Sequence, residues 1–362
     1  MTNILLILAA LLLVAIFLVI FRATKLISIF RNDSDPDKVS QSNNIHAYLF
    51  LILPIIGFSL AGWYAVHHLG LINPPHASKN AEITEPLFHQ ATVVILLMFV
   101  ITNAALFFFA FKYRYKEGYK ATFFTDNVKL EIVWTIVPAV ILVLLVVQGW
   151  QAWKKIMYHP EENSRQIEVM GHQFAWKVRY PGADGKIGKY NFRYTDATNE
   201  MGLDFNDKKN DDDFMTSEIH IQKGMPVVFN IRARDVLHSF SLPHFRQKMD
   251  AVPGMPTKLW LTPTKTTSEM RQELQGRPEY QTIDEKSGKT RADGFNYEIA
   301  CQEVCGRGHF AMRLVIVVDD EIDYKKWLAA QKPFTEVNKE YVAKARIQQQ
   351  KAKASGVAMV SK

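Results

Sequence analysis

The 362-residue sequence has only two cysteines, Cys301 and Cys305, and this scarcity excludes two common kinds of iron centre. An ordinary iron–sulfur cluster needs four cysteine ligands. A covalently attached c-type haem needs the spacing Cys-x-x-Cys-His, whereas three residues separate the two cysteines here. We therefore expect no haem in this chain.

Basic residues are missing from the start of the chain, ahead of its first apolar run. This run, Ile4–Phe21, has 18 apolar residues without a break, which is the length of a minimal membrane span. A secretory signal peptide would have a basic region before the run and a small-x-small cleavage site after it, and the sequence has neither. The run is therefore predicted to be a retained transmembrane helix.

Three further apolar runs predict additional membrane spans, at Ala47–Leu69, Ala91–Phe111 and Ile132–Trp153. The first of them contains Pro54 and Gly57, and both residue types are tolerated in membrane helices. Together with Ile4–Phe21, these runs predict four spans.

The basic residues between the spans predict the orientation of the chain. They lie between the first and second spans and between the third and fourth: Arg22, Lys25, Arg31, Lys38, Lys112, Arg114, Lys116, Lys120 and Lys129. The loop from Gly70 to Pro86 has only Lys79. By the positive-inside rule, both termini and everything after Trp153 lie on the outer side of the membrane.

From Gln166 onward the sequence indicates short strands separated by turns. The predicted strands are 174–180, Ser217–Ile221, Val227–Ala233, Trp260–Thr262, Asn296–Ala300 and Leu314–Val318. Asn206–Asp213 is polar and acidic, which predicts a surface loop, and the charged stretch Pro263–Gly294 predicts a long insertion over the surface. Many short strands of this kind favour a β-sandwich.

The C-terminal tail, residues 321–362, has nine Lys or Arg against four Asp or Glu, a net charge of +5 out of the chain's +7. Such a balance is found in nucleic-acid-binding segments, but an exported tail does not meet nucleic acid. A solvated helix or a docking segment is the expected structure, and no nucleic-acid partner is expected.

The segment Cys301–Met312 combines two cysteines with His309 and Met312, a soft ligand set that favours copper. A small disulfide between Cys301 and Cys305 is an alternative, although it leaves His309 and Met312 unexplained. A single blue copper needs only one cysteine, so the second thiolate suits two copper ions that share both sulfurs. His238, at the end of a predicted strand, is the candidate for the further ligand.

These motifs resemble, in order and in residue type, subunit II of haem–copper cytochrome c oxidases. The resemblance runs from about Leu87 to Trp327 and rests on three motifs: Asp235–Phe240, Asp250–Gly254 and Cys301–Met312. It implies a cupredoxin-like all-β sandwich after a transmembrane α-helical hairpin, which the third and fourth predicted spans would form. The two N-terminal spans have no counterpart in the common pattern of this family.

The resemblance also implies a role for each motif residue. Cys301 and Cys305 would bridge the two ions of a binuclear copper centre. His238 and Met312 would complete one copper, and His309 with the backbone carbonyl of Glu303 the other. The Glu303 side chain would bind magnesium or manganese at the boundary with subunit I.

Two further roles are implied by the resemblance. Glu131, just before Ile132-Val133-Trp134-Thr135-Ile136-Val137-Pro138, matches the family's glutamate at the entrance of a proton channel, although an interfacial acidic residue is usually only solvated. Phe174 matches the tryptophan that receives electrons from cytochrome c, and Trp176 follows it. Alternating aromatic residues are also typical of core packing.

The predicted organisation has four parts. Residues 1–80 form an extension with two transmembrane helices, 81–155 the helical hairpin, 156–320 the outer copper domain with an insertion near 263–294, and 321–362 the basic tail. The chain is predicted to lie in the inner (cell) membrane with its copper domain on the periplasmic side.

The predicted function is that of an electron-accepting subunit. Electrons from a c-type cytochrome would reach the copper pair and pass to subunit I, which reduces O2 to water and pumps protons. Subunits I and III are the expected partners. Spans one and two are hypothesised to dock an upstream quinol-oxidising membrane complex, and the alternative is that they brace subunit I or III. A copper chaperone is disfavoured because His238 precedes the cysteines, and a nitrous oxide reductase because it has no place for the third and fourth spans.

Overall fold

The structure is a computed structural model that describes residues 2–30, 39, 41–158, 160–285 and 287–354. Within its helices, the side chains of residues 2–10, 28–30, 69, 71 and 72 are not described. Arg31, Lys38 and the end of the tail, residues 355–362, on which parts of the predictions rest, lie outside the described residues. The chain forms two compact units, one of Met1–His67 with Val93–Trp134 and the other of His68–Thr92 with Thr135–Lys362.

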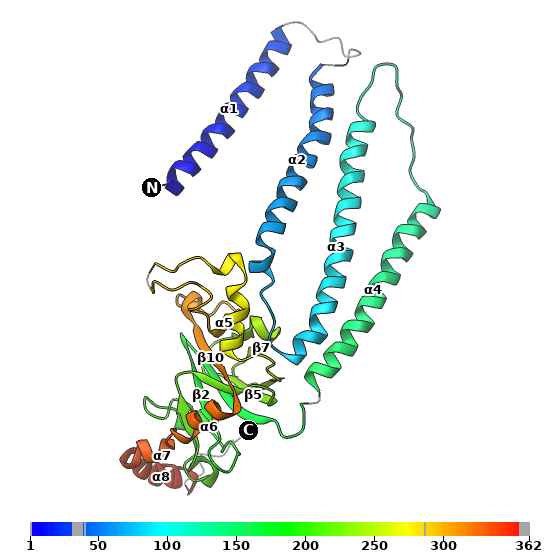
Figure 1. The fold of residues 1–362 in the computed structure, drawn as a ribbon. Helices are drawn as coiled ribbons and strands as arrows, with labels where there is room; N and C mark the ends of the chain where they lie inside the picture. Colours follow the sequence, from blue (N-terminus) through cyan, green and yellow to red (C-terminus); the bar gives the residue numbers. More distant parts are fainter. Residues whose placement is uncertain (1, 31–38, 40, 159, 286, 355–362) are drawn as a thin grey trace. The chain divides into compact units, whose positions relative to one another are not determined.

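Four long helices open the chain: α1 (Thr2–Phe30), α2 (Gln41–Ile72), α3 (Lys79–Lys112) and α4 (Val128–Met157) (Figure 1). Among the described residues, three stretches are long and apolar enough to cross a membrane, namely Gln41–His68, Lys79–Lys112 and Val128–Met157. They contain the second, third and fourth predicted spans. The first predicted span lies within α1, whose side chains are described only for residues 11–27, and it stays a prediction.

Aromatic contacts join α2 to α3 in the first unit. Phe58 packs edge-on against Phe99 with 5.5 Å between ring centroids, and Phe50 stacks with Phe107 at 6.3 Å. Such close packing is a main source of attraction between helices in lipid, where the hydrophobic effect is absent. The second of the two extra helices is therefore packed against a helix of the hairpin.

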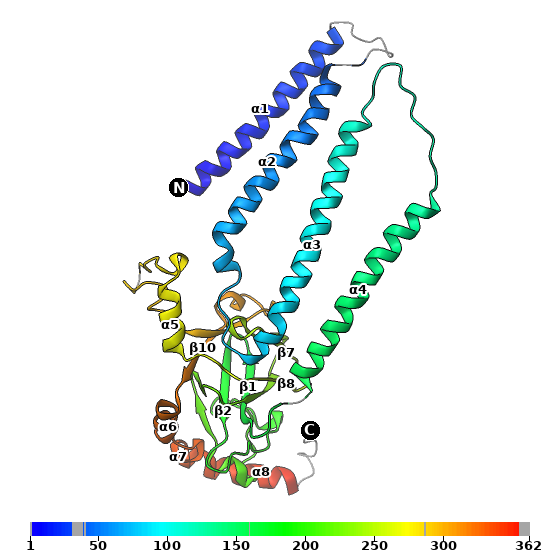
Figure 2. The same ribbon diagram turned by 45° about the vertical axis from the view of Figure 1, so that its right-hand side comes forward.

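The second unit contains two five-stranded sheets, ordered β3-β2-β1-β5-β8 and β4-β10-β9-β6-β7 (Figure 2). The strands are β1 (Arg165–His172), β2 (Ala175–Tyr180), β3 (Phe214–Thr216), β4 (Ile219–Gln222), β5 (Val227–Ala233), β6 (His238–Leu242), β7 (Gln247–Ala251), β8 (Thr257–Leu261), β9 (Tyr297–Cys301) and β10 (Arg313–Asp319). The predicted order of apolar helices followed by a cupredoxin-like sandwich is confirmed. Strand 227–233 is predicted to the residue, whereas β2 begins one residue after Phe174.

The main core lies between the two sheets because each strand turns alternate side chains inward. Val169, Phe229 and Ile231 from one sheet and Phe240 and Ile299 from the other are fully buried. The same cluster includes Cys301, Cys305 and Met312. Three of the predicted copper ligands thus belong to the main core of the domain.

The connection between α2 and α3 is hydrogen-bonded to the sandwich. Ser78 caps α3 by accepting the backbone N–H of Ala81 at 3.0 Å, and its hydroxyl donates to the carbonyl of Phe245 at 2.8 Å. Arg246 donates to the carboxylate of Glu85 at 2.8 Å and to Asn73 at 2.6 Å. The start of α3 is therefore held by the outer domain.

The insertion 263–294 departs from its prediction as a surface stretch. It contains α5 (Thr267–Gln275) and the short 3-10 helix η4 (Pro278–Tyr280). Met270 and Leu274 on α5 are completely buried in the main core. Two apolar residues four positions apart lie on one face of a helix, which explains how a charged segment contributes to the core.

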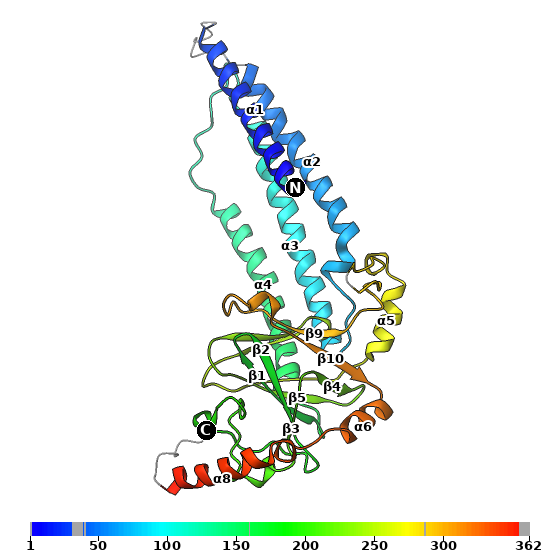
Figure 3. The ribbon, with the colours of Figure 1, turned by 90° about the vertical axis from the view of Figure 1, so that its left-hand side faces the viewer.

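A second, smaller core lies outside the sandwich and involves the tail, which forms α6 (Glu321–Ala329), α7 (Phe334–Val337) and α8 (Lys339–Ala354) (Figure 3). The tail residues Phe334, Val342 and Ala345 pack with Leu203 and Phe205 from the segment between β2 and β3. This segment also contains the 3-10 helices η1 (Phe192–Tyr194) and η2 (Lys208–Asn210). The tail is therefore docked on its own domain, which agrees with the second of the two expected structures, a docking segment, and not with a solvated helix.

Acidic residues of the β2–β3 segment are buried or bound to the tail. Asp213 is completely buried, so the prediction that 206–213 is a surface loop is wrong at this position. Lys353 pairs with Asp204 at 2.8 Å and Arg346 with Asp211 at 2.6 Å. The positive charge of the tail is therefore partly neutralised within the chain, by carboxylates of the β2–β3 segment.

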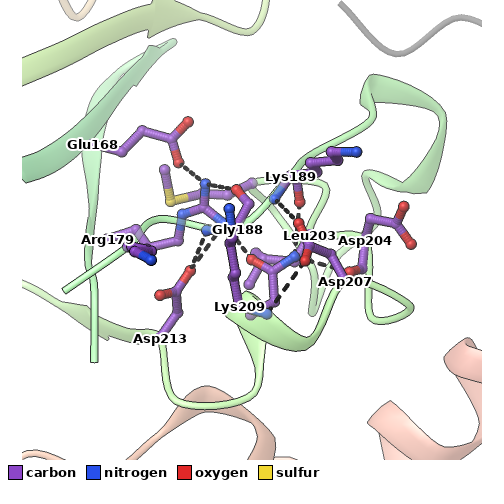
Figure 4. Close-up of polar contacts among 12 residues, drawn as sticks. Glu168, Arg179, Gly188, Lys189, Leu203, Asp204, Asp207, Lys209 and Asp213 are labelled. Carbon is purple, nitrogen blue, oxygen red and sulfur yellow. Dashed lines mark hydrogen bonds and ion pairs between the residues drawn. The ribbon is translucent and has the colours of Figure 1, made fainter. Parts of the chain in front are cut away.

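An ion network connects this second core to the first sheet. The Arg179 guanidinium, which is fully buried, lies 2.6 Å from Glu168 and 3.3 Å from Asp213 (Figure 4). Glu168 also binds Arg232 at 2.9 Å. The β2–β3 segment covers Arg179, and buried charges are stable only when paired.

Candidate metal centre

The predicted ligands meet where three neighbouring strands begin or end. His238 is the first residue of β6, Cys301 is the last of β9, and the loop 302–312 leads into β10. Phe240 on β6 is paired with Cys301 on β9, which brings His238 close to a loop more than 60 residues later in the chain. Strand pairing therefore assembles the site.

The donor atoms form one compact cluster. The sulfurs of Cys301 and Cys305 are 4.0 Å apart, and both cysteines are free thiols. Four contacts complete it: His238 Nδ1 to Cys301 Sγ at 4.0 Å, the Glu303 carbonyl to Cys301 Sγ at 3.3 Å, His309 Nδ1 to Cys305 Sγ at 3.7 Å and Met312 Sδ to Cys305 Sγ at 3.8 Å. The structure brings together all six predicted metal residues.

This spacing fits a metal centre. Ligand atoms at about 2.0 to 2.3 Å from a tetrahedral first-row metal lie about 3.5 Å from one another. The six donors are separated by similar distances, and His238, Cys301 and Cys305 are all buried. Two soft thiols with imidazole and thioether donors suit copper, so the residues present fit a binuclear copper centre.

Two residues outside the ligand set orient it. His238 turns Nε2 toward Asp235 Oδ1 at 2.9 Å, which leaves Nδ1 facing Cys301. The other Asp235 oxygen accepts the backbone N–H of Gln173 at 2.8 Å, and the Gln173 side chain donates to the Cys305 carbonyl. A chain of hydrogen bonds thus connects His238 to Cys305 through Asp235 and Gln173.

The electrostatics of the site reflect its burial. Burial and the neighbouring Cys301 raise the pKa of the Cys305 thiol to about 11. Burial would also raise the pKa of Asp235, but hydrogen bonds from Gln173 and His238 hold that pKa below its usual range. A metal ion would supply the positive charge that both thiolates need.

Comparison with known proteins identifies the family. A model of the transmembrane domain of cytochrome c oxidase subunit II matches residues 66–151, and a model of the periplasmic domain of the same subunit matches residues 165–272. The chain is 32% identical over 240 residues to the alternative cytochrome c oxidase subunit 2 of Bradyrhizobium diazoefficiens. The aligned region covers 65% of this chain and 76% of that protein. The chain belongs to the cytochrome c oxidase subunit II family.

More distant relatives include cytochrome c oxidase subunit 2 of Thermostichus vulcanus, 23% identical over 337 residues, which cover 78% of this chain and 85% of that protein. Among solved structures, the periplasmic domain of subunit II of cytochrome oxidase from Bradyrhizobium japonicum aligns with 47% of this chain and 95% of its own length. Its identity is 19% and its TM-score 0.30, which is too low to bear on the fold.

Membership in this subunit II family makes the chain part of a haem–copper oxidase complex, and the family as a whole binds copper. It also gives a membrane protein whose sandwich domain lies on the outer side. The match to the periplasmic-domain model ends at residue 272, so the segment Cys301–Met312 lies beyond it. The roles of the individual ligands in this family member therefore rest on their geometry.

The two aromatic candidates for electron entry occupy different environments. Phe174 is 40% exposed and lies over the copper-binding loop, since a Cβ atom added at Gly308 would be 2.5 Å from its ring. Trp176 is only 4% exposed and packs edge-on against Phe240 in the core, 6.0 Å from the His238 ring. Of the two, Phe174 is the one that a protein partner can contact directly.

Glu131 lies apart from the metal residues, in the first turn of α4, and its side chain is exposed. The helix begins with Asn127, whose side chain accepts the backbone N–H of Leu130 at 3.1 Å. An acidic residue in the first turn is favoured by the helix dipole, which is a sufficient structural reason for it. The structure therefore gives a local account of Glu131 and leaves its proton role a prediction.

Asp235 and Gln173 are not among the predicted site residues, although Asp235 lies in the motif Asp235–Phe240. The spacing Asp-x-x-His was the available signal for Asp235, because a carboxylate commonly orients a metal-binding histidine. No sequence pattern pointed to Gln173, whose contact with Cys305 crosses 132 residues of chain.

Proposed function

We propose that this chain accepts electrons from a c-type cytochrome at a binuclear copper centre and passes them to subunit I of the oxidase. Subunit I would use them to reduce O2 to water, with proton pumping across the inner membrane. The proposed copper ligands are His238, Cys301, the Glu303 carbonyl, Cys305, His309 and Met312. The complex would also contain subunit III.

One observation carries this proposal: two free, buried thiols stand 4.0 Å apart with a further donor pair beside each sulfur. His238 and the Glu303 carbonyl lie beside Cys301, while His309 and Met312 lie beside Cys305. One proposed copper would bind His238 and Met312, and the other His309 and the Glu303 carbonyl. Each copper thus takes one donor from beside Cys301 and one from beside Cys305. This is the arrangement that two ions sharing both thiolates require.

When bound, such a thiolate-bridged copper pair shares one electron over both metals and exchanges it with little change in geometry. The chain's own residues hold that geometry. The strand ends fix His238 and Cys301, and Asp235 fixes the orientation of the His238 ring. Ligands held in place before and after electron transfer keep the reorganisation small.

The remaining roles belong to the same proposal. Phe174 is the proposed point of electron entry, because it is exposed and touches the copper-binding loop, and Trp176 lies behind it next to His238. The Glu303 side chain is proposed to bind magnesium or manganese at the subunit I boundary, and Glu131 to open a proton path into that subunit. The four-part division at residues 80, 155 and 320 also stays part of the proposal.

The copper centre can be tested in the purified chain reconstituted with copper. The wild type should give a seven-line electron paramagnetic resonance pattern, which arises when one electron is shared by two copper nuclei. Cys301→Ser should abolish it, because a hydroxyl does not bridge two coppers as a thiolate does. Met312→Leu should keep both coppers and shift their potential, since the thioether is a tuning ligand. A Cys301→Ser protein that retains the seven-line pattern would refute the assignment.

A further inference from the structure

A cavity of about 540 Å³ lies beside the copper-binding end of the outer domain. Ala233 and Arg234, which form part of its wall, directly precede Asp235, the residue that orients His238. Other parts of the wall come from Arg232 on β5, from Tyr190 and Phe192 in and before η1, and from Met255 in the loop after β7. The cavity thus adjoins the residues that hold the metal ligands.

The charge of this cavity has one sign. Among the described residues that line it, the charged ones are Arg232 and Arg234, and none is a carboxylate. Arg232 is 8% exposed and stacks on Tyr190, with 3.8 Å from its Cζ to the ring centroid. The Arg232 Nε donates to the Glu168 carboxylate, and its Nη2 donates to the Met201 carbonyl. The remaining nitrogen, Nη1, forms no hydrogen bond with the described residues and is not enclosed by them. A nearly buried guanidinium therefore keeps one donor group available.

The carboxylates nearby do not cancel this charge. Glu168 serves both Arg232 and the buried Arg179. Asp213 is the second anion of that network, but burial raises its pKa to about 7, so it is only partly ionised at neutral pH. The two guanidiniums of Arg179 and Arg232 thus face fewer than two full negative charges.

The residues around the cavity and Phe174 carry charges of both signs: Lys177, Arg234 and Arg307 are cationic, and Glu200 and Asp235 are anionic. Glu200 is shared by Lys177 at 2.8 Å and Arg234 at 3.9 Å. Arg307 is exposed between Gly306 and Gly308, the two glycines that contact the Phe174 ring. A partner that reaches Phe174 therefore meets several cations.

Exposed apolar side chains stand at the mouth of the cavity. Phe192 is 69% exposed and Met255 is 56% exposed. Aromatic residues, methionine and arginine are the residue types most enriched in protein interfaces. The combination of a cationic interior and an apolar mouth is typical of a pocket that receives a side chain of another protein.

We propose that this cavity receives a carboxylate side chain of the electron-donating protein, and that Arg232 and Arg234 thereby select a donor whose contact surface is acidic. The proposal rests on the proposed function, since it concerns the donor to the copper centre. Guanidinium groups recognise carboxylates through paired hydrogen bonds, and charges at the rim of an interface chiefly set partner choice and association rate.

The test uses the full chain in detergent micelles and one basic cytochrome c in two forms, native and with its lysines succinylated. Succinylation replaces each positive charge by a carboxylate without changing the haem. Binding is measured by isothermal titration calorimetry on the metal-free chain, so that the result is independent of the copper assignment. We expect the succinylated form to bind more tightly than the native form, with an affinity that falls as salt is added.

Three variants sharpen this test. Arg234→Gln should weaken binding of the succinylated cytochrome about fivefold, the effect of losing one interfacial ion pair. The control is Arg277→Gln, because Arg277 is equally exposed (35% against 36% for Arg234), is also weakly paired, and does not line the cavity. Phe192→Ser, at an exposed position, should also weaken binding.

Tighter binding of the native basic form, or equal effects of the Arg234 and Arg277 substitutions, would overturn the proposal. Failure of the proposed function would look different. In that case the copper-loaded chain would lack the seven-line spectrum, whatever the outcome of the binding measurements.

Discussion

At the scale of single residues, the site depends on side chains that touch no metal. Asp235 accepts hydrogen bonds from His238 at 2.9 Å and from the Gln173 backbone at 2.8 Å, so one carboxylate serves both sides of the copper-binding loop. Such supporting partners restrict the rotation of a ligand before the metal arrives. Loss of such a partner therefore lowers the metal affinity even though every ligand remains.

We predict that Asp235→Ala lowers the copper affinity of the chain about 10-fold to 100-fold, the usual cost of losing a partner that orients a metal-binding histidine. The measurement is a competition titration against a copper chelator. Asp319→Ala is the matched control, because Asp319 binds His220 at 2.6 Å in the same domain but away from the ligands. Equal affinities for wild type and Asp235→Ala would contradict the prediction.

His244 gives the outer domain a pH dependence of its own. Burial, together with the nearby Arg246, lowers the pKa of His244 to about 4, and its Nε2 has no hydrogen-bond partner among the described residues. The folded state therefore binds a proton less readily than the unfolded state, whose histidine has a pKa of about 6.5. The contribution of neutral His244 to the free energy of unfolding is fully present above pH 6.5 and is lost as the pH falls toward 4.

We predict that this loss reaches up to about 3 kcal/mol between pH 6.5 and pH 4. His244→Phe should reduce the slope over that window, since a phenyl ring can pack against Phe295 and Tyr297 and takes up no proton. The thermal unfolding midpoint of the outer domain, followed by near-ultraviolet circular dichroism of the detergent-solubilised chain, gives the comparison. Parallel pH curves for variant and wild type would exclude His244 as the source.

At the scale of elements, the tail and the β2–β3 segment depend on each other. Phe334 stacks on Phe205 with 5.9 Å between ring centroids, and its backbone N–H donates to the carbonyl of Asp213 at 2.8 Å. Gln349 on α8 accepts the backbone N–H of Phe205 at 2.8 Å. Neither segment has enough apolar surface to form a core alone, so they fold as one layer over the first sheet.

We predict that Phe334→Ala costs the tail about 3 kcal/mol, the usual cost of deleting a buried phenyl group, and exposes α8 to trypsin at Lys344 and Arg346. The copper spectrum should not change, because the ligands lie in the separate main core. Val337→Ala, at a 65% exposed position of the same short helix, is the control. Unchanged proteolysis in Phe334→Ala, or a lost copper spectrum, would contradict this division into two cores.

At the scale of the whole molecule, the proposed electron and proton functions belong to different parts of the chain. The proposed copper ligands lie in the sandwich domain, and Glu131 lies in the first turn of α4. Reduction of copper by the donor needs only the former, whereas reduction of O2 in subunit I consumes protons as well as electrons. A defect at Glu131 should therefore appear only in the assembled complex.

We predict that Glu131→Gln slows oxygen reduction by the complex and leaves copper reduction by the donor at its normal rate. Stopped-flow absorbance separates the two steps. Glu162→Gln is a suitable control, because Glu162 lies in the loop between α4 and β1, outside the membrane helices. Equal slowing of both steps, or no change in either, would remove Glu131 from the proton path.

The sequence by itself determined the family of this protein and much of its architecture. Two cysteines, a histidine and a methionine within 12 residues predict a soft metal site. Uninterrupted apolar runs of this length predict membrane helices, since a single helix pairs all of its own backbone N–H and C=O groups in lipid. Alternation over 227–233 specified β5, because one face of that strand meets the core.

Only the tertiary structure decided which distant residues meet. It placed Phe174 at the surface and Trp176 in the core, although their alternation is the same pattern. It buried Arg179 and Asp213, and it docked the basic tail on the acidic β2–β3 segment. The physical reason is that periodicity reports the neighbours of a residue along one element. Burial of a charge or exposure of a ring depends on which other segment covers it, and that segment can lie about 30 residues away, as for Arg179, or more than 100, as for the docked tail.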